Sequence, residues 1–379
     1  MNAPHSKMTP KPVNLALQGG GAHGAFSWGV LDRLLEDERI EIAAITGASA
    51  GAMNAVALAD GLAGGCREEA RAALRRFWDA VCDAARASPL RRTMFDVARG
   101  GWNLDNSPIY IMFDLISRLA SPYDYNPMNL NPLRDLVTEI VDFDRVRSCK
   151  VQLFISATNV ETGRTKVFNH GELTPDHIMA SACLPHIFRA VEIDGVPYWD
   201  GGYMGNPPLW PLFDHSIADD VIIVQINPFT RPGVPRSARD ILNRLNEITF
   251  NASLLREIRA VDFVTRLLDQ GRLEGTGYRR VLAHMIEDEE TLSALGASSK
   301  MNAEHAFIEM LFEKGRSVTD AWLADHFDDI GQKSTLDIRR LFMCEEDALD
   351  GYRIERLAEF AKAAQPKTAE TAETNAKNT

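Results

Sequence analysis

The sequence predicts an α/β protein with a mainly parallel central sheet and a helical C-terminal region. Strand-like apolar runs alternate with helical patterns up to about residue 230, which is typical of parallel strands joined by helices. Glycine-rich junctions connect the first two strands to the helices that follow them. Helical periodicity then takes over from residue 238, so we expect the C-terminal third to be an extension of the α/β part.

The first strand-like run covers residues 13–18 and leads directly into a glycine-rich segment. A helical pattern follows over residues 25–35. Consecutive glycines between a strand and a helix allow several backbone N–H groups to point at one spot, which suits a phosphate or an oxyanion. We therefore expect an anion-binding loop formed by Gly19, Gly20, Gly21, Ala22, His23 and Gly24.

The second strand-like run, residues 42–46, ends at the segment Gly47-Ala48-Ser49-Ala50-Gly51. A helical pattern follows over residues 52–58. Strand, Gly-x-Ser-x-Gly and helix form the nucleophile elbow of serine hydrolases, in which Gly47 and Gly51 leave room for a strained turn. The pattern predicts that Ser49 is a nucleophile, and an ordinary turn of small residues is the alternative.

A dinucleotide site is a competing interpretation of the glycine loop. Gly19, Gly21 and Gly24 match Gly-x-Gly-x-x-Gly, but that fingerprint needs an acidic residue at the end of the next strand to bind a ribose. Here that strand ends at Thr46 and Gly47, and Glu41 stands before the strand. The elbow occupies the place of the ribose-binding acid, which disfavours a dinucleotide site.

A candidate general base follows a predicted hairpin. The runs 189–193 and 196–199 are joined by Asp194-Gly195, a strong hairpin turn signal. The second run ends at Asp200, which precedes Gly201 and Gly202. Strands are also expected at 151–159, 165–168 and 220–227, with a helix at 176–183. Taken alone, Asp200 is better explained as a plain turn residue, which is the commonest use of Asp-Gly.

The glycine loop, the Ser49 elbow and Asp200-Gly201-Gly202, in that order, resemble the patatin-like phospholipase family. The resemblance extends over residues 13–228, including 180–185 and 206–208. It implies a three-layer sandwich with a mainly parallel sheet, an oxyanion hole in the glycine loop, Ser49 as nucleophile and Asp200 as base. It implies no metal and no organic cofactor. The family often has Arg or Lys where this chain has His23.

A Ser–Asp pair places a chemical demand on the aspartate. A carboxylate with a pKa near its reference value of ~3.9 is a weak base toward a serine hydroxyl, so partial desolvation is needed. We expect Tyr198 and Trp199 to form the apolar wall beside Asp200. A histidine-based triad is the alternative, with His170 and His186 as its turn-located candidates.

Composition is that of an ordinary globular enzyme. The chain has 379 residues, 45% of them hydrophobic, and a net charge of −12, which allows a sizeable core and argues against a nucleic-acid partner. The five scattered cysteines show no disulfide or zinc pattern. No apolar leader and no 18-residue apolar run are present, so we expect a cytoplasmic location, with non-classical export left open.

Four regions are expected along the chain. Residues 1–12 form a flexible lead, and 13–235 form the catalytic domain. Within it, 89–132 is either a lid or acyl-chain channel, or an amphipathic helix packed on the core. Residues 236–364 form a helical region serving as a cap or an oligomerisation surface, and 365–379 form a disordered tail.

The expected function is hydrolysis of phospholipid or related lipid acyl esters. An intracellular esterase, thioesterase or polyester hydrolase would use the same residues, and a scaffold without turnover would keep the same fold. Transient contact with a membrane surface is one role for Arg86, Arg91, Arg92 and Arg99, and a solvated helix face is the other. The sequence leaves the oligomeric state open.

Overall fold

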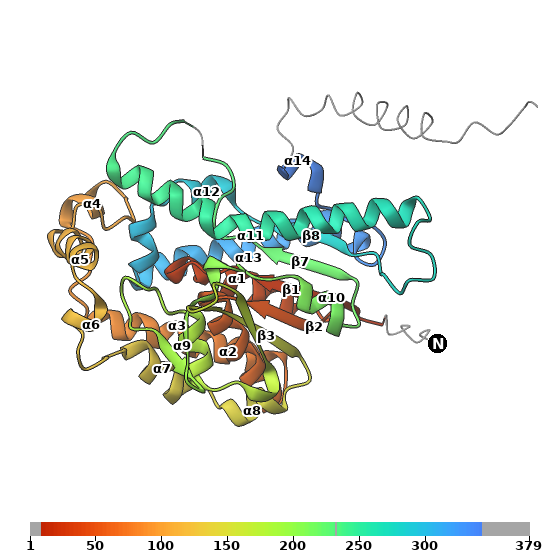
Figure 1. The fold of residues 1–379 in the computed structure, drawn as a ribbon, viewed down its shortest axis with the longest axis horizontal. Helices are drawn as coiled ribbons and strands as arrows, with labels where there is room; N and C mark the ends of the chain where they lie inside the picture. Colours follow the sequence, from red (N-terminus) through yellow and green to blue (C-terminus); the bar gives the residue numbers. More distant parts are fainter. Residues whose placement is uncertain (1–8, 232, 343–379) are drawn as a thin grey trace, which may run out of the picture. The chain divides into compact units, whose positions relative to one another are not determined.

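The computed structural model describes residues 9–231 and 233–342 (Figure 1). It divides the chain into two compact units, 1–336 and 337–379. The expected tail at 365–379, the last part of the expected helical region and most of the expected lead lie outside the described residues. Strand β1 begins at Lys11, so the lead is shorter than the expected 1–12.

A central sheet dominates the first unit. It contains eight strands in the order β5-β6-β3-β2-β1-β7-β8, with β4 also paired to β3. The strands are β1 (Lys11–Leu17), β2 (Ile40–Gly47), β3 (Gln152–Asn159), β4 (Thr165–Asn169), β5 (Val191–Ile193), β6 (Val196–Asp200), β7 (Asp220–Val224) and β8 (Leu282–Ile286). The pairs among β3, β2, β1, β7 and β8 are parallel, and those of β4, β5 and β6 are antiparallel. The predicted mainly parallel α/β fold is confirmed.

Helices connect and cover these strands. The described α-helices are α1 (Gly24–Glu36), α2 (Ala50–Gly64), α3 (Arg67–Arg86), α4 (Met94–Ala98), α5 (Pro108–Leu119), α6 (Pro122–Tyr125), α7 (Pro132–Ile140), α8 (Phe143–Ser148), α9 (Pro175–Ser181), α10 (Trp210–His215), α11 (Ala238–Asp269), α12 (Glu289–Ser293), α13 (His305–His326) and α14 (Ile338–Phe342). The short 3₁₀ segments are η1 (Gly21–His23), η2 (His170–Glu172), η3 (Gly201–Tyr203), η4 (Ala297–Met301) and η5 (Phe327–Asp329).

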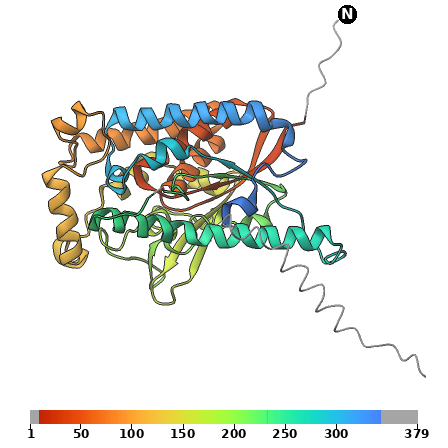
Figure 2. The same cartoon turned by 90° about the horizontal axis from the view of Figure 1, so that it is seen from above.

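The strand order reverses direction beside β1. The chain steps from β1 to β2 and β3 on one side, and from β7 to β8 on the other. Because parallel crossovers are right-handed, the two directions place their helices on opposite faces. Figure 2 accordingly shows the sheet between α13 and α1 on one side and α11 on the other. Ligand sites in such sheets form at the carboxyl ends of the strands where the order reverses, which here is the end of β1.

The C-terminal region up to residue 336 belongs to the first unit. The expected all-helical region 236–364 contains β8, which pairs with β7 in the central sheet. Helix α13 packs on α1 at very close range: a Cβ on Gly29 would lie 2.0 Å from the Phe312 carbonyl oxygen, and one on Gly315 would lie 2.1 Å from that of Phe26. The expected boundary at 235/236 therefore does not separate two compact units. Strand β8, Leu282–Ile286, lies in a region for which the sequence predicts only helices.

None of the helices in residues 9–231 and 233–342 combines the length and the hydropathy that crossing a membrane requires.

Candidate active site

Ser49 occupies a sharp turn between β2 and α2. Its backbone has φ 52° and ψ −118°, a conformation that is strained for a residue with a side chain. A Cβ at Gly51 would lie 2.2 Å from the Leu17 carbonyl oxygen, and one at Gly47 would lie 2.8 Å from the Gly51 carbonyl carbon. Only glycine fits at these two positions. The Ser49 N–H donates to Ser181 Oγ at 2.9 Å.

The glycine loop after β1 lies directly against this turn. A Cβ at Gly19 would approach the Ser49 Cβ to 2.7 Å. The Gly19 N–H donates to Asn206 Oδ1 at 2.6 Å, the His23 N–H donates to the Gly20 carbonyl, and the Gly24 N–H donates to loop carbonyls. These contacts narrow the expected six-residue oxyanion loop to three candidate donors. The remaining N–H groups are those of Gly20, Gly21 and Ala22.

Gly21 and Gly20 provide a matched test of the loop geometry. Gly21 has φ +59°, and a Cβ there would lie 2.4 Å from the Lys300 carbonyl oxygen. Gly21→Ala is therefore expected to destabilise the fold by about 1–3 kcal/mol. At Gly20 the nearest atom, at 2.8 Å, is the terminal methyl of Ile226, and φ is an ordinary 172°, so Gly20→Ala is expected to cost less. Chemical denaturation of both variants checks the ranking, and an equal loss would contradict it.

Strand register brings Asp200 to Ser49. In β3, Ile155 pairs with Gly47 of β2 and Ala157 pairs with Asp200 of β6. Ser49 follows Gly47 by two residues, so it reaches the level of Ala157 on the opposite side of the same strand. The loop, the elbow and Asp200 thus meet at the carboxyl end of β1 and β2.

The Asp200 carboxyl is buried, with 1% of the residue exposed. Burial raises its pKa from 3.8 to about 6, while the Gly202 N–H, the Ser49 hydroxyl and the charge of Lys300 lower it. Oδ1 accepts from the Gly202 N–H at 2.7 Å. Oδ2 makes no hydrogen bond of ordinary geometry to any described residue. Catalytic hydrogen bonds often tighten only when substrate binds.

One of the two residues expected beside Asp200 points away from it. Side chains alternate along a strand, so Trp199 lies on the opposite side of β6 from Asp200, whereas Tyr198 lies on the same side and packs against Phe168. Burial raises the pKa of Cys183 and of Tyr203 to about 12, and the charge of Asp200 adds to both changes. The Asp200 N–H donates to the Cys183 carbonyl at 2.8 Å.

His23 is a buried core residue. It is 2% exposed, Nε2 lies 2.8 Å from Ser299 Oγ, and the ring meets Phe307 edge-on. Burial, with the nearby charge of Lys300, lowers its pKa to about 3. The imidazole is therefore neutral at ordinary pH, and position 23 provides no cation to the loop.

None of the described histidines donates to or accepts from Ser49. His284 lies 2.9 Å from both Asp220 Oδ1 and Thr335 Oγ1, and His177 lies 2.8 Å from Thr174 Oγ1. The two turn candidates, His170 and His186, belong to η2 and to the loop after α9. The geometry around Ser49 therefore favours the aspartate over a histidine-based triad.

A network of buried polar side chains contacts the glycine loop, and the sequence patterns do not predict it. Asn227 Nδ2 donates to the Gly19 carbonyl at 2.8 Å and to Gln18 Oε1 at 3.1 Å. Lys300 Nζ donates to Asn227 Oδ1 at 2.7 Å. Ser181 and Asn206 lie in segments that resemble the family, which is a signal for both. No local pattern marks Asn227 or Lys300.

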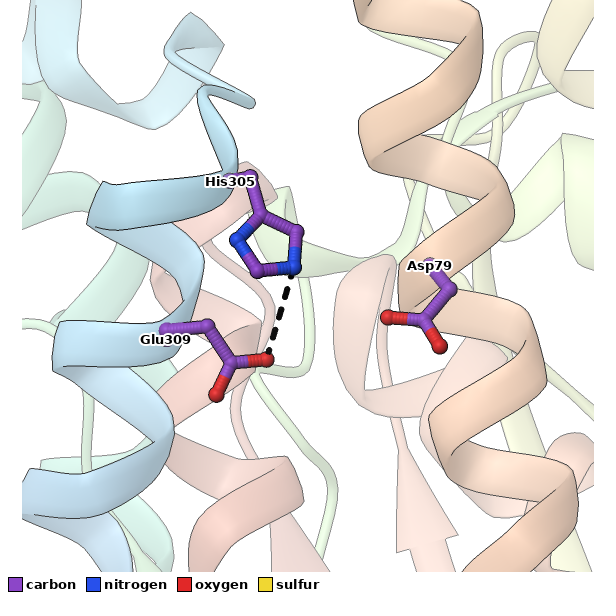
Figure 3. A group of neighbouring side chains, drawn as sticks. All are labelled: Asp79, His305 and Glu309. Carbon is purple, nitrogen blue, oxygen red and sulfur yellow. Dashed lines mark ion pairs between the residues drawn. The ribbon is translucent and has the colours of Figure 1, made fainter.

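A separate cluster of two acidic side chains and one histidine lies between α3 and α13. Asp79, His305 and Glu309 place one ligand atom each within 4.8 Å of one another (Figure 3). His305 is exposed, and Glu309 already forms an ion pair with Arg75. Because exposed acidic groups commonly cluster without a metal, we assign no metal to this group. Neither Ser49 nor Asp200 is among its members.

Comparison with known proteins identifies one family. The family described as patatin-like phospholipase matches residues 15–213, more than half of the 379-residue chain. The comparison with curated protein sequences gave no match.

Solved structures give weaker similarities. VipD from Legionella pneumophila is 12% identical, with 94% of this chain and 88% of that chain covered and a TM-score of 0.30. ExoU from the type III secretion system of Pseudomonas aeruginosa, in complex with SpcU, is 15% identical, with 96% of this chain and 65% of that chain covered, also at 0.30. This chain thus spans about two thirds of ExoU. TM-scores this low carry no conclusion about the present chain.

Proposed function

Since the chain belongs to the patatin-like phospholipase family, we propose that it is a serine hydrolase of phospholipids or related lipid acyl esters, acting through Ser49 and Asp200. One observation carries this proposal. A buried carboxyl with a pKa raised to about 6 faces a serine held on a strained elbow. A base whose pKa lies near the working pH is suited to proton transfer.

The proposed reaction has two halves. The Asp200 carboxylate accepts the hydroxyl proton while Ser49 Oγ attacks the ester carbonyl carbon. The free N–H groups of the glycine loop bind the negative carbonyl oxygen. The intermediate then collapses, the leaving alcohol takes the proton from Asp200, and an acyl-enzyme remains. Asp200 then takes a proton from a water molecule as the water oxygen attacks that ester. When this second intermediate collapses, Ser49 Oγ takes the proton back from Asp200 and the fatty acid leaves.

An exposed apolar surface supports a lipid substrate. Helix α5 contains no buried residue, although most of its side chains are apolar. The large hydrophobic side chains exposed on α4–α6, the adjoining loops and the first turns of α11 are Met94, Phe95, Val97, Ile109, Ile111, Met112, Leu115, Ile116, Leu119, Tyr123, Met128, Leu130, Ile241, Leu242, Leu245 and Ile248. We call these side chains the apolar face. So large a patch marks an interaction surface.

The segments that carry the apolar face contact η4, the loop after α9 and one another. The Leu104 N–H donates to Ser298 Oγ in η4, and Tyr125 Oη donates to the His186 carbonyl, beyond α9. Arg239 of α11 pairs with Asp105, just before α5. Figure 2 shows α5 crossing one end of the molecule between the levels of α13 and α11.

Charge favours a lipid surface as the partner of this face. Residues 91–130 contain four arginines and four aspartates and therefore no net charge, whereas the whole chain carries −12. A neutral apolar surface meets a zwitterionic bilayer without repulsion, and burial of its side chains supplies the binding energy. We infer that the apolar face contacts the lipid surface from which the site takes its substrate. The expected arginine patch contributes less, because Arg92 is paired with Glu304.

Vesicle binding tests this contact. The double variant Leu115→Gln and Leu119→Gln is expected to weaken sedimentation with phosphatidylcholine vesicles by about tenfold or more, because two large side chains lose their burial in lipid. Hydrolysis of a water-soluble ester is expected to stay unchanged. The control variant changes Ile217 and Tyr278, which are equally exposed elsewhere, to Gln. Equal weakening in both variants would remove the apolar face from the proposal.

Labelling with a fluorophosphonate probe tests the hydrolase itself. We expect one adduct, located by mass spectrometry on Ser49, together with release of fatty acid from phospholipid vesicles. An adduct with turnover only on soluble esters or thioesters would favour the non-lipid alternative. A folded protein that forms no adduct would favour a scaffold without turnover.

A further inference from the structure

We propose that Lys300 is a positioning residue of this site, whose ammonium group braces the glycine loop through Asn227 and supplies positive charge near Asp200. The inference rests on the proposed Ser49–Asp200 hydrolysis. It concerns a residue of η4, outside the 15–213 segment that the family match covers.

Lys300 touches the loop in two ways. Lys300 Nζ donates to Asn227 Oδ1 at 2.7 Å, and Asn227 Nδ2 in turn donates to the Gly19 carbonyl at 2.8 Å. The backbone carbonyl oxygen of Lys300 lies so close to Gly21 that a Cβ on Gly21 would be 2.4 Å from it. Gly19 contacts Ser49, and Gly21 is one of the candidate oxyanion donors. The position of Lys300 therefore affects both reacting parts of the loop.

The segment that contains Lys300, η4, is fixed by hydrogen bonds on either side of that residue. Ser298 and Ser299 are buried. Ser298 Oγ accepts from the Leu104 N–H at 3.0 Å, Ser299 Oγ lies 2.8 Å from His23 Nε2, and the Asn302 amide donates to the Trp102 carbonyl at 2.9 Å. A residue fixed on both sides in this way is pre-organised, which is what an electrostatic role requires.

The charges around Lys300 are few and can be named. Desolvation lowers its pKa to about 8, the acids Glu247 and Asp200 oppose that change, and Arg231 adds to it. Glu247 is already paired with Arg231 and Arg244, and His23 is neutral. Asp200, by contrast, has no cationic partner within hydrogen-bond distance among the described residues. Lys300 Nζ lies 5.8 Å from the centroid of the Phe250 ring, and a Cβ on Gly202, two residues after Asp200, would lie 2.4 Å from that same ring. The positive charge of Lys300 lowers the pKa of Asp200.

Removing this charge is expected to change how hydrolysis depends on pH. An opposite charge stabilises the ionised carboxylate, so its loss raises the pKa of Asp200 above about 6. The base must be ionised to act, and the rising limb of kcat/KM therefore moves to higher pH. Each unit of that displacement lowers activity about tenfold on the acidic side of the limb. A merely structural residue would lower activity by the same factor at every pH.

The experiment compares three full-length variants with the wild type on a soluble ester from pH 5 to 9. Lys300→Met keeps the chain length and removes the charge. Lys300→Arg keeps the charge. Lys314→Met removes a lysine of α13 that forms an ion pair with Asp288, and it controls for the change in net charge. Fluorophosphonate labelling of Ser49 is followed over the same pH range, because it reports activation of the serine without deacylation.

In Lys300→Met we expect the rising limb of the pH profile to move to higher pH, for both hydrolysis and labelling. In Lys300→Arg and Lys314→Met we expect it to stay near its wild-type position. An unmoved limb in a folded Lys300→Met protein overturns the inference while leaving the Ser49–Asp200 hydrolysis intact. Equal displacement in Lys314→Met overturns it as well. If Lys300→Met does not fold, a displaced limb in Lys300→Arg overturns it and an unmoved one supports it. A wild type without label or turnover overturns the proposed function and this inference together.

Discussion

Replacing Ser49 with alanine is expected to reduce ester hydrolysis by roughly 10⁴-fold or more, because no other group in the proposed reaction can form the acyl-enzyme. The residual rate would come from the oxyanion donors and substrate binding alone. Stability is expected to change little, since Ser49 is only partly buried. Steady-state hydrolysis and thermal unfolding measure the two effects.

The strained backbone of Ser49 supplies an internal control. At φ 52° a glycine is unstrained, so Ser49→Gly is expected to be equally inactive but more stable than Ser49→Ala by about 1 kcal/mol. Substantial hydrolysis by both variants, with the label on another residue, would show that Ser49 is not the nucleophile.

Replacing Asp200 with asparagine has the second largest expected effect. An amide cannot accept the serine proton, so a loss of about 10³-fold or more is expected. The amide oxygen can still accept from the Gly202 N–H, which keeps the local turn. Wild-type kcat/KM is expected to rise with pH to a plateau above about 6, where Asp200 is ionised. The variant should show no such limb.

The same substitution is expected to stabilise the protein at high pH. The folded-state pKa of Asp200 is raised from 3.8 to about 6, so the folded state binds this proton more tightly than the unfolded state and loses stability as the pH rises between the two values. A change of that size corresponds to about 3 kcal/mol. Asp200→Asn is thus expected to unfold a few degrees later than wild type at pH 8, with the gain vanishing toward pH 4.

Asp220 offers a matched control for this prediction. It is also a buried aspartate at a strand end, 4% exposed, but its Oδ1 contacts His284 and the Gly331 N–H. Asp220→Asn is expected to remain active and to be less stable than the wild type, because it weakens the contact with His284. Activity lost equally in both variants would point to structural damage as the cause in each.

Local patterns determined the first half of the site. The glycine loop, the elbow at Ser49 and the hairpin turn at Asp194-Gly195 each depend on backbone freedom within a few residues, so composition and spacing were enough to predict them. The structure has β5 and β6 on either side of Asp194 and Gly195, both at positive φ. The order of strands β1 to β7 also follows from local patterns, as do helices α1, α2, α3 and α9, whereas α4, α6, α7, α8 and α10 were not predicted.

Tertiary structure decided which of these groups work together. Asp200 meets Ser49 because two strands pair with β3 in a particular register, and periodicity does not encode register between distant strands. The Gly19 N–H of the glycine loop donates to Asn206 and is therefore not a candidate oxyanion donor. The positive charge near this loop belongs to Lys300, whereas His23 is neutral. Strand β8 joined the sheet because β7 presents an edge that pairs with it. Sequence by itself therefore determined the chemical groups, whereas long-range packing determined their partners and pKa values, because both depend on burial and on contacts between residues far apart in the chain.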